Sequence, residues 1–174
     1  MGVVNATPDS FSDGGRFLDP HHAIDHALAL IAEGASIIDI GGESTRPSAD
    51  DFPQAEELAR VLPIVKGLAE QAIAPISIDT RKPFVARACI DAGAAIWNDV
   101  SALRHAPESA AEAARSGARI VLMHAPGAPK SMQDAPAYDD VVGEVEAFLK
   151  TRIAAAAAAG VAPQHLIVDP GIGF

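Results

Sequence analysis

Short apolar runs alternate with helical patterns along this chain, and the alternation predicts an α/β fold. The apolar runs cover residues 1–5, 36–40, 76–79, 95–98, 119–123 and 166–168. Runs that are this short and this apolar are typical of parallel strands buried on both faces. Crossovers between such strands are expected to be right-handed.

The segments between the strands carry helical periodicity. The helical patterns cover residues 22–32, 53–71, 83–93, 107–116 and 139–159. Gly34 follows the first pattern and Gly160 the last, and glycine commonly ends helices at such positions. Pro63 lies inside the second pattern and predicts a kink there. No stretch has the composition of a linker, so residues 1–174 are predicted to form one domain.

Polar residues follow the predicted strands. Five strands lead into polar segments at residues 5–15, 41–47, 79–81, 98–101 and 169–171, and the sixth ends at His124. Repeated β/α folds place their ligands at the carboxyl ends of the strands. An open sheet concentrates such residues at one switch point, whereas a barrel brings every strand end to one mouth. The pattern therefore favours a TIM (β/α)8 barrel, of which this chain holds about six β/α units.

Composition and charge narrow the class of ligand. The chain has 174 residues, 49% of them apolar, and a net charge of −10, which argues against nucleic acid or an anionic membrane as a partner. No apolar run approaches the roughly 20 residues of a membrane span. The single cysteine, Cys89, cannot form an internal disulfide, so a cytoplasmic setting is expected. An anionic ligand must be held by local groups such as Arg46, Arg81, Lys82, backbone amides or a metal ion.

Two loops carry a resemblance to a known family. Asn5-Ala6-Thr7-Pro8-Asp9-Ser10-Phe11-Ser12-Asp13-Gly14-Gly15 resembles the first signature of the dihydropteroate synthase family. Gly41-Gly42-Glu43-Ser44-Thr45-Arg46-Pro47 resembles its second loop. Similar to the family's pterin-binding positions are Asp79-Thr80-Arg81, Asn98-Asp99-Val100-Ser101 and Asp169-Pro170-Gly171-Ile172-Gly173-Phe174. These segments occur in the family's order along the whole chain.

Two mild departures and one larger one accompany the resemblance. After His124 this chain has Ala125-Pro126, where the family usually has Met-Gln or a similar pair. Ser101-Ala102 stand where the family usually has Ser-Gly. Family members also continue past the equivalent of Phe174 with two further strands, which carry a pterin-binding lysine and a phosphate-binding Arg/His pair. The chain is therefore expected to be a fragment that covers about two-thirds of a barrel.

The resemblance implies an enzyme of folate biosynthesis. The family's reaction joins p-aminobenzoate to 6-hydroxymethyl-7,8-dihydropterin pyrophosphate and gives dihydropteroate and pyrophosphate, with magnesium assisting. The family is the target of sulfonamides, which compete at the aminobenzoate site. A homodimer is implied for the whole protein. No general base is required of the protein, because a neutral aniline nitrogen is already a nucleophile.

Strand-end residues match the family's pterin-binding positions. The resemblance assigns Asp169 to accept both pyrimidinone donors of the pterin, since a carboxylate has two acceptor oxygens side by side. Asp79 and Asn98 would meet other ring nitrogens, and Met123 would offer flat apolar contact. Alternatively, Asp169 makes only a turn, Asp79 caps the following helix, and Asn98 serves a turn. Asp39 lies inside an apolar strand and is expected to be a buried acid paired with a base or an amide.

The loop residues match positions around the second substrate and the diphosphate. Asn5 is the expected contact to the metal ion or the diphosphate, and Arg46 adds positive charge there. The residues expected to build the aminobenzoate pocket are Phe11, Ser44, Thr45, Arg46, Pro47 and Phe174. Asn5, Thr45 and Arg46 are the residues expected to take part in catalysis.

Other candidate residues have less support from the sequence. His22 and His26 have the i, i+4 spacing of metal ligands but lie in an ordinary amphipathic pattern, so a solvated surface is expected. His124 is either part of a pocket floor or a structural histidine, and Cys89 is expected to pack within a helix. Two other functions stay open, namely a pterin-binding module without catalysis and a methyltetrahydrofolate-binding methyltransferase domain. The loops at 7–10 and 43–47 argue against the methyltransferase.

Overall fold

The computed structural model describes residues 1–6, 19–43, 53–125 and 138–172. Its strands are β1 (Gly2–Asn5), β2 (Ile38–Gly41), β3 (Ile76–Asp79), β4 (Ile96–Asp99), β5 (Arg119–Met123) and β6 (Leu166–Asp169). They form one sheet in the order β1-β2-β3-β4-β5-β6, and every neighbouring pair is parallel. Each strand pairs with the next one along the chain, so the sheet lacks the order reversal of a doubly wound fold. The predicted α/β class is confirmed, with six β/α strands arranged as a barrel wall.

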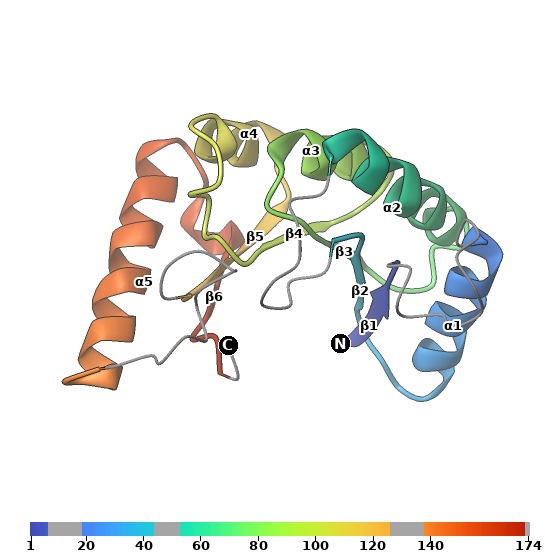
Figure 1. The fold of residues 1–174 in the computed structure, drawn as a ribbon, viewed down its shortest axis with the longest axis horizontal. Coiled ribbons are helices and arrows are strands. Elements are labelled where there is room, and N and C mark those ends of the chain that lie inside the picture. Colours follow the sequence, from blue (N-terminus) through green and yellow to red (C-terminus); the bar gives the residue numbers. More distant parts are fainter. Residues whose placement is uncertain (7–18, 44–52, 126–137, 173–174) are drawn as a thin grey trace.

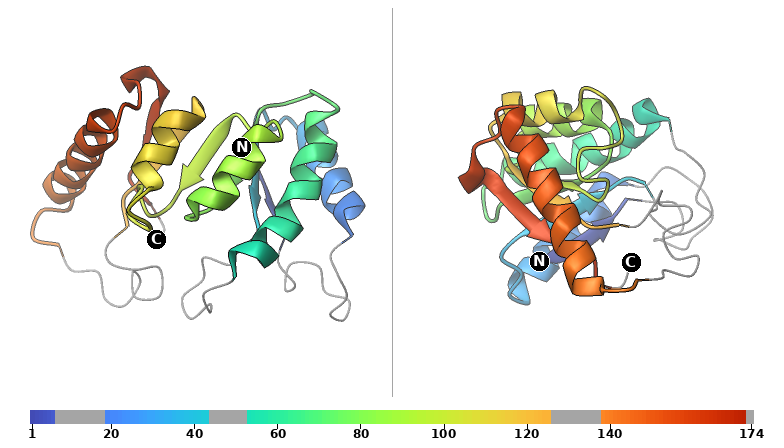
Figure 2. Two further views of the ribbon diagram at one scale, coloured as in Figure 1. Left: turned by 90° about the horizontal axis from the view of Figure 1, so that it is seen from above. Right: turned by 90° about the vertical axis from the view of Figure 1, so that its left-hand side faces the viewer.

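The wall is not closed. Within the described residues β1 and β6 each pair with one strand only, so the six strands form an open arc (Figure 1). The described helices are α1 (Pro20–Ala32), α2 (Gln54–Ala69), α3 (Pro83–Asp91), α4 (Ser109–Ser116), α5 (Val141–Ala158) and the short 3-10 helix η1 (Pro163–His165). The helices α1 to α5 lie on the convex side of the arc, and Figure 2 shows them following one another in chain order. None of the described helices is both long and apolar enough to be a candidate for a membrane span.

Local sequence explains where several helices begin and end. Asp19 caps α1 by accepting a hydrogen bond from the His21 amide at 3.0 Å, and Pro20 suits the first helical position. Asp140 caps α5 by accepting from the Gly143 amide at 3.1 Å. Helix α4 ends at Gly117, whose φ of 67° lies in the left-handed region that favours glycine. The observed helix ends differ from the sequence prediction by a few residues.

The sheet has an apolar outer face and a more polar inner face. Alternate residues of a strand point to opposite faces. The buried residues that face the helices include Val4, Ile38, Ile40, Ile76, Ile78, Trp97, Ile120 and Leu122. Asp39, Ser77, Asp79 and Asn98 alternate with them and therefore face the inner side. The hydrophobic core thus lies between sheet and helices, and the polar chemistry lies on the concave side.

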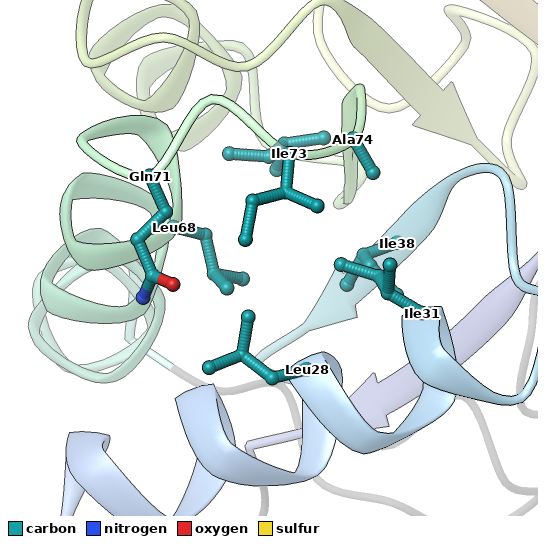
Figure 3. Close-up of a pocket in the computed structure, with 8 residues that line it drawn as sticks. Leu28, Ile31, Ile38, Leu68, Gln71, Ile73 and Ala74 are labelled. Atoms are coloured by element: carbon teal, nitrogen blue, oxygen red, sulfur yellow. The ribbon is translucent and has the colours of Figure 1, made fainter.

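An apolar depression lies between α1, α2 and the start of two strands. Its lining residues are Leu28, Ile31, Ile38, Leu68, Gln71, Ile73, Ala74 and Ile76 (Figure 3). Ile38 and Ile76 are the first residues of β2 and β3. The depression is therefore at the amino ends of the strands, away from the polar strand ends.

Candidate functional site

Asn5, Gly41, Asp79 and Asn98 form one row across β1 to β4. Asn5 pairs with Gly41, Gly41 with Asp79, and Asp79 with Asn98 in the strand register. A Cβ atom at Gly41 would lie 3.5 Å from Asp79 Oδ2 and 3.8 Å from Asn5 Oδ1. The two side-chain oxygens therefore approach each other above a residue that has no side chain.

Asp169 and Met123 lie on the same face, further toward the carboxyl ends. Asn98 pairs with Val121, and Met123, two residues on, pairs with Asp169. Because strand side chains repeat with a period of two, all of these side chains face the inner side. Three strand spacings, roughly 14 Å along the sheet, separate Asp79 from Asp169. The register thus brings Asp79, Asn98 and Asp169 to one end of one face.

An acidic side chain lies beneath this row and is hydrogen-bonded to it. Asn98 Nδ2 donates to Asp39 Oδ2 at 3.1 Å, and Asp39 is only 5% exposed. The pairing of a buried acid with an amide is the arrangement expected for Asp39 from the sequence. Burial raises the pKa of Asp39, and the neighbouring Ser77 hydroxyl and Asn98 amide counter that rise.

The surroundings of Asp79 disfavour the ionised form of its carboxyl group. Its Oδ1 is shielded from solvent and has no hydrogen-bond partner among the described residues. Burial raises the pKa of Asp79 well above its ordinary value, and the negative charges of Asp39, Asp99, Glu57 and Glu43 add to the rise. A ligand that donates a hydrogen bond to this carboxyl would satisfy an otherwise costly group.

The structure tests the local roles, a helix cap or a turn, that the sequence left open for Asp79, Asn98 and Asp169. Asp79 does not cap α3; instead Thr80 Oγ1 accepts from the Lys82 amide at 3.1 Å, and the helix start has no side-chain cap. Asn98 is engaged by Asp39 instead of a turn. Asp169 does make a turn, because its Oδ1 accepts from the Gly171 amide at 2.8 Å. That turn uses one of the two carboxylate oxygens of Asp169.

A buried ion cluster joins α2 to the segments that follow β2 and β3. Lys82 Nζ lies 2.6 Å from Glu57 Oε2 and 2.9 Å from Glu43 Oε2. Arg81 pairs with Glu43 Oε1 at 2.9 Å. This cluster was not predicted from the sequence. The available signal was Glu57 itself, which shares a helical stripe with the buried residues Val61, Ile64 and Leu68.

Arg81 and Lys82 bind carboxylates of the protein itself in this cluster. Arg81 and Lys82 were expected to be available for an anionic ligand, but Lys82 is 8% exposed and contacts two carboxylates of the protein itself. Burial works to raise the pKa of Glu43, yet the hydrogen bonds from Lys82 and Arg81 outweigh it and hold that pKa below its ordinary value. Lys82 is therefore a structural cation.

The loop after β4 is organised by Asp99, on the helix side of the sheet. Its carboxylate accepts from the Ser101 amide and hydroxyl, both at 2.7 Å, and from the Leu103 amide at 2.8 Å. Burial raises the pKa of Asp99 to about 6, against these hydrogen bonds. The Trp97 indole donates to the Thr80 carbonyl at 2.8 Å and ties this strand end to the preceding one.

The remaining candidates are structural or exposed. His124 is buried and meets the Phe148 ring edge-on at a centroid distance of 5.0 Å. His22 and His26 are exposed on α1. Cys89 is buried in α3, and burial raises the pKa of its thiol to about 12, which disfavours the nucleophilic thiolate. Among the described residues no group of three or more His, Cys, Asp or Glu is placed to hold a metal ion.

Comparison with known proteins decides the family. The model of the family described as pterin binding enzyme matches residues 1–174. The chain belongs to the pterin-binding enzyme family. A dihydropteroate synthase from Mycobacterium leprae is 50% identical over 175 residues, which is 100% of this chain and 61% of that protein. The chain thus spans about three-fifths of the length of the curated relatives that it matches.

Solved structures of relatives share the fold of this chain. Xanthomonas albilineans dihydropteroate synthase with 4-aminobenzoic acid has a TM-score of 0.91 at 51% identity, covering 100% of this chain and 61% of that one. The same enzyme in complex with 7,8-dihydropteroate has a TM-score of 0.86 at 47% identity, covering 100% and 60%. These relatives place the arc of strands within the family's barrel.

Several of the predicted site residues lie outside the described residues. They are Phe11, Ser44, Thr45, Arg46, Pro47 and Phe174. Their roles stay predictions. Asn5 is described and is exposed at the end of β1, and Met123 is 2% exposed beside Asp169.

The turn after Asp169 supplies a test of the architecture. Gly171 has a φ of 71°, and a Cβ there would lie 2.1 Å from the His124 carbonyl oxygen. We expect Gly171→Ala to lower the free energy of unfolding of the whole protein by about 3 kcal/mol, measured with denaturant. Gly117→Ala is the matched control, because Gly117 has a φ of 67° with open space around it. Equal losses in the two variants would show that the contact with His124 is unimportant.

Proposed function

We propose that the whole protein is a dihydropteroate synthase that condenses p-aminobenzoate with 6-hydroxymethyl-7,8-dihydropterin pyrophosphate, giving dihydropteroate and pyrophosphate. Relatives of about half identity carry that name, and the enzyme from Xanthomonas albilineans was solved once with 4-aminobenzoic acid and once with 7,8-dihydropteroate. The sequence resemblance of the two glycine-rich loops points the same way.

One observation carries the proposal: a row of hydrogen-bond acceptors at the carboxyl ends of the strands. Asp79, Asn98 and Asp169 come from three strands and face the same side. A pterin presents an edge of N–H and amino donors, which such acceptors complement. Asp169 would receive two of these donors, Asp79 and Asn98 would receive others, and Met123 would lie against the flat ring.

Catalysis in this proposal is mostly positioning and charge stabilisation. Departure of the diphosphate leaves a stabilised pterin methylene cation, which the neutral aniline nitrogen attacks. Arg46 would stabilise the leaving diphosphate, while Ser44, Thr45 and Pro47 with Phe11 and Phe174 would hold the aminobenzoate. Exclusion of water from the site would protect the cation from hydrolysis.

Magnesium fits this scheme through the substrate. Mg²⁺ is commonly held by one or two protein oxygens together with substrate phosphates. Asn5 offers an amide oxygen at the exposed end of β1, and the described residues offer no cluster of acids that would hold the ion alone. A bound Mg²⁺ would neutralise charge on the diphosphate. Asn5 would orient that diphosphate.

The cellular compartment and the oligomeric state are proposed from composition and from the family resemblance. We propose that the whole protein works in the cytoplasm as a homodimer, because its single cysteine suits a reducing compartment and the family resemblance implies a dimer. Its ligands would be small molecules, with no nucleic acid partner, in line with the net charge of −10.

A turnover assay on the whole protein tests the proposal. We expect release of pyrophosphate and formation of dihydropteroate when both substrates and Mg²⁺ are present, with competitive inhibition by a sulfonamide against p-aminobenzoate. Binding of the pterin without turnover would favour a non-catalytic pterin-binding module. Methyl transfer from methyltetrahydrofolate, with no use of p-aminobenzoate, would favour the methyltransferase alternative and overturn the proposal.

A further inference from the structure

Asp39 reaches across the sheet to a residue of the candidate site. It lies on β2, and its register partner on β3 is Ser77, one layer beneath the row of Asp79 and Asn98. Its Oδ2 accepts a hydrogen bond from Asn98 Nδ2 on β4, so the bond spans the position of β3. Such a diagonal contact is possible because Ser77, the residue between them, is small.

The chemistry of the pair defines how the Asn98 amide is oriented. An ionised carboxylate only accepts hydrogen bonds, so the NH2 group of Asn98 must face Asp39 and its carbonyl oxygen must face away. Without such a partner the two ends of an asparagine amide are nearly equal in shape, and either can face a ligand. Burial raises the pKa of Asp39, and the hydrogen bonds from Ser77 and Asn98 counter part of that rise.

The orientation matters because of the neighbours of Asn98. Asp79 beside it in the row offers carboxylate oxygens, and its Oδ1 lacks a hydrogen-bond partner among the described residues. With the Asn98 carbonyl oxygen turned away from Asp39, both side chains present acceptors. A flipped amide would instead place a donor beside Asp79 and would repel an N–H edge of a ligand.

We propose that Asp39 is a positioning residue that locks the Asn98 amide with its oxygen toward the ligand, which makes this part of the site selective for a donor-rich edge. The inference rests on the proposed function, because it takes a dihydropterin as the ligand. Asp39 itself does not contact the ligand; it acts through Asn98. The 5% exposure of Asp39 agrees with this supporting role.

Asp39→Asn in the whole protein is the first test. The new amide can present either end to Asn98, so the orientation is no longer enforced. We expect the Kd for 6-hydroxymethyl-7,8-dihydropterin, measured by calorimetry, to rise about tenfold. The KM for the pterin substrate should rise with it, while the KM for p-aminobenzoate stays unchanged. A loss caused only by poorer folding would change both KM values or neither.

An exchange variant provides the rescue. Asp39→Asn together with Asn98→Asp keeps the net charge and restores a donor–acceptor pair, with an acceptor oxygen again at position 98. We expect this double variant to bind the pterin more tightly than Asp39→Asn alone. Asp140→Asn is the control, since it makes the same change at the start of α5, where Asp140 accepts a hydrogen bond from the Gly143 amide at 3.1 Å. The control should bind the pterin as the unmodified protein does.

The outcomes separate the two proposals. If the unmodified whole protein fails to bind the dihydropterin, the proposed function is wrong. If it binds the dihydropterin but Asp39→Asn binds equally well, or the double variant is no better than Asp39→Asn, the positioning role of Asp39 is wrong. A tenfold loss in Asp39→Asn that the exchange reverses supports it.

Discussion

Lys82→Met should lower the free energy of unfolding of the whole protein by about 3–5 kcal/mol, measured by denaturant titration. Lys82 contacts Glu57 at 2.6 Å and Glu43 at 2.9 Å, and Glu57 is fully buried. Methionine keeps the length of the side chain but removes the cation. Arg81 would still pair with Glu43, but the buried Glu57 would lose the cation that it contacts.

Two further variants show that the loss comes from the charge. Lys150→Met removes a lysine of an exposed ion pair with Glu146 on α5, so little change is expected. Lys82→Met combined with Glu57→Gln removes both members of the buried pair and should recover part of the loss. If Lys82→Met were no worse than Lys150→Met, the cluster would contribute nothing to stability.

The pH dependence gives the same cluster an independent signature. The pKa of Glu43 is held below its ordinary value of 4.5, so the stability that this ionisation contributes is present above that pH. It is lost as the pH falls through the lowered pKa. The difference between the unmodified protein and Lys82→Met should therefore shrink in acid, because protonated carboxyl groups no longer need the cation.

Asp169→Asn should weaken pterin binding by about 2–3 kcal/mol, or roughly 30- to 150-fold in the Kd measured by calorimetry. Asparagine keeps the oxygen that accepts from the Gly171 amide at 2.8 Å, so the turn is preserved. The second oxygen becomes an NH2 group, which faces the N–H donors of the pterin and repels them. The variant therefore separates the turn from ligand binding.

The control for Asp169→Asn is the same change at the start of α5. Asp140 also accepts a backbone hydrogen bond, from the Gly143 amide at 3.1 Å, and asparagine can serve that cap equally well. Asp140→Asn should leave both stability and pterin affinity near those of the unmodified protein. Unchanged pterin affinity in Asp169→Asn would remove Asp169 from the pterin site and leave it as a turn residue only.

The ion cluster and the acceptor row occupy neighbouring parts of the fold. Arg81 and Lys82 follow Asp79 closely at the end of β3, and Glu43 follows Gly41 closely at the end of β2. A Cβ at Gly42 would come within 2.7 Å of Val61 Cγ1, so the chain passes close to α2 at this point. Packing and ion pairs together hold the strand ends on which the acceptors stand.

The sequence alone determined the order of strands and helices and the polar character of the strand ends. Those features are local: apolar runs, helical periodicity, proline and glycine positions, and the motifs that carry the family resemblance. The burial of Cys89 in a helix and the pairing of Asp39 with an amide or base also followed from short patterns. The site residues themselves were named from the resemblance.

Only the tertiary structure decided which distant side chains meet. Strand register sets Asp79 beside Asn98 and Met123 beside Asp169, and a shift by one residue would have turned each to the other face. The identity of Asn98 as the partner of Asp39, and of Glu43 and Glu57 as the partners of Lys82, depends on how separate β/α units pack. The sequence specifies which chemical group stands at each position. Hydrogen bonding between strands and the packing of helices determine the distances between those groups.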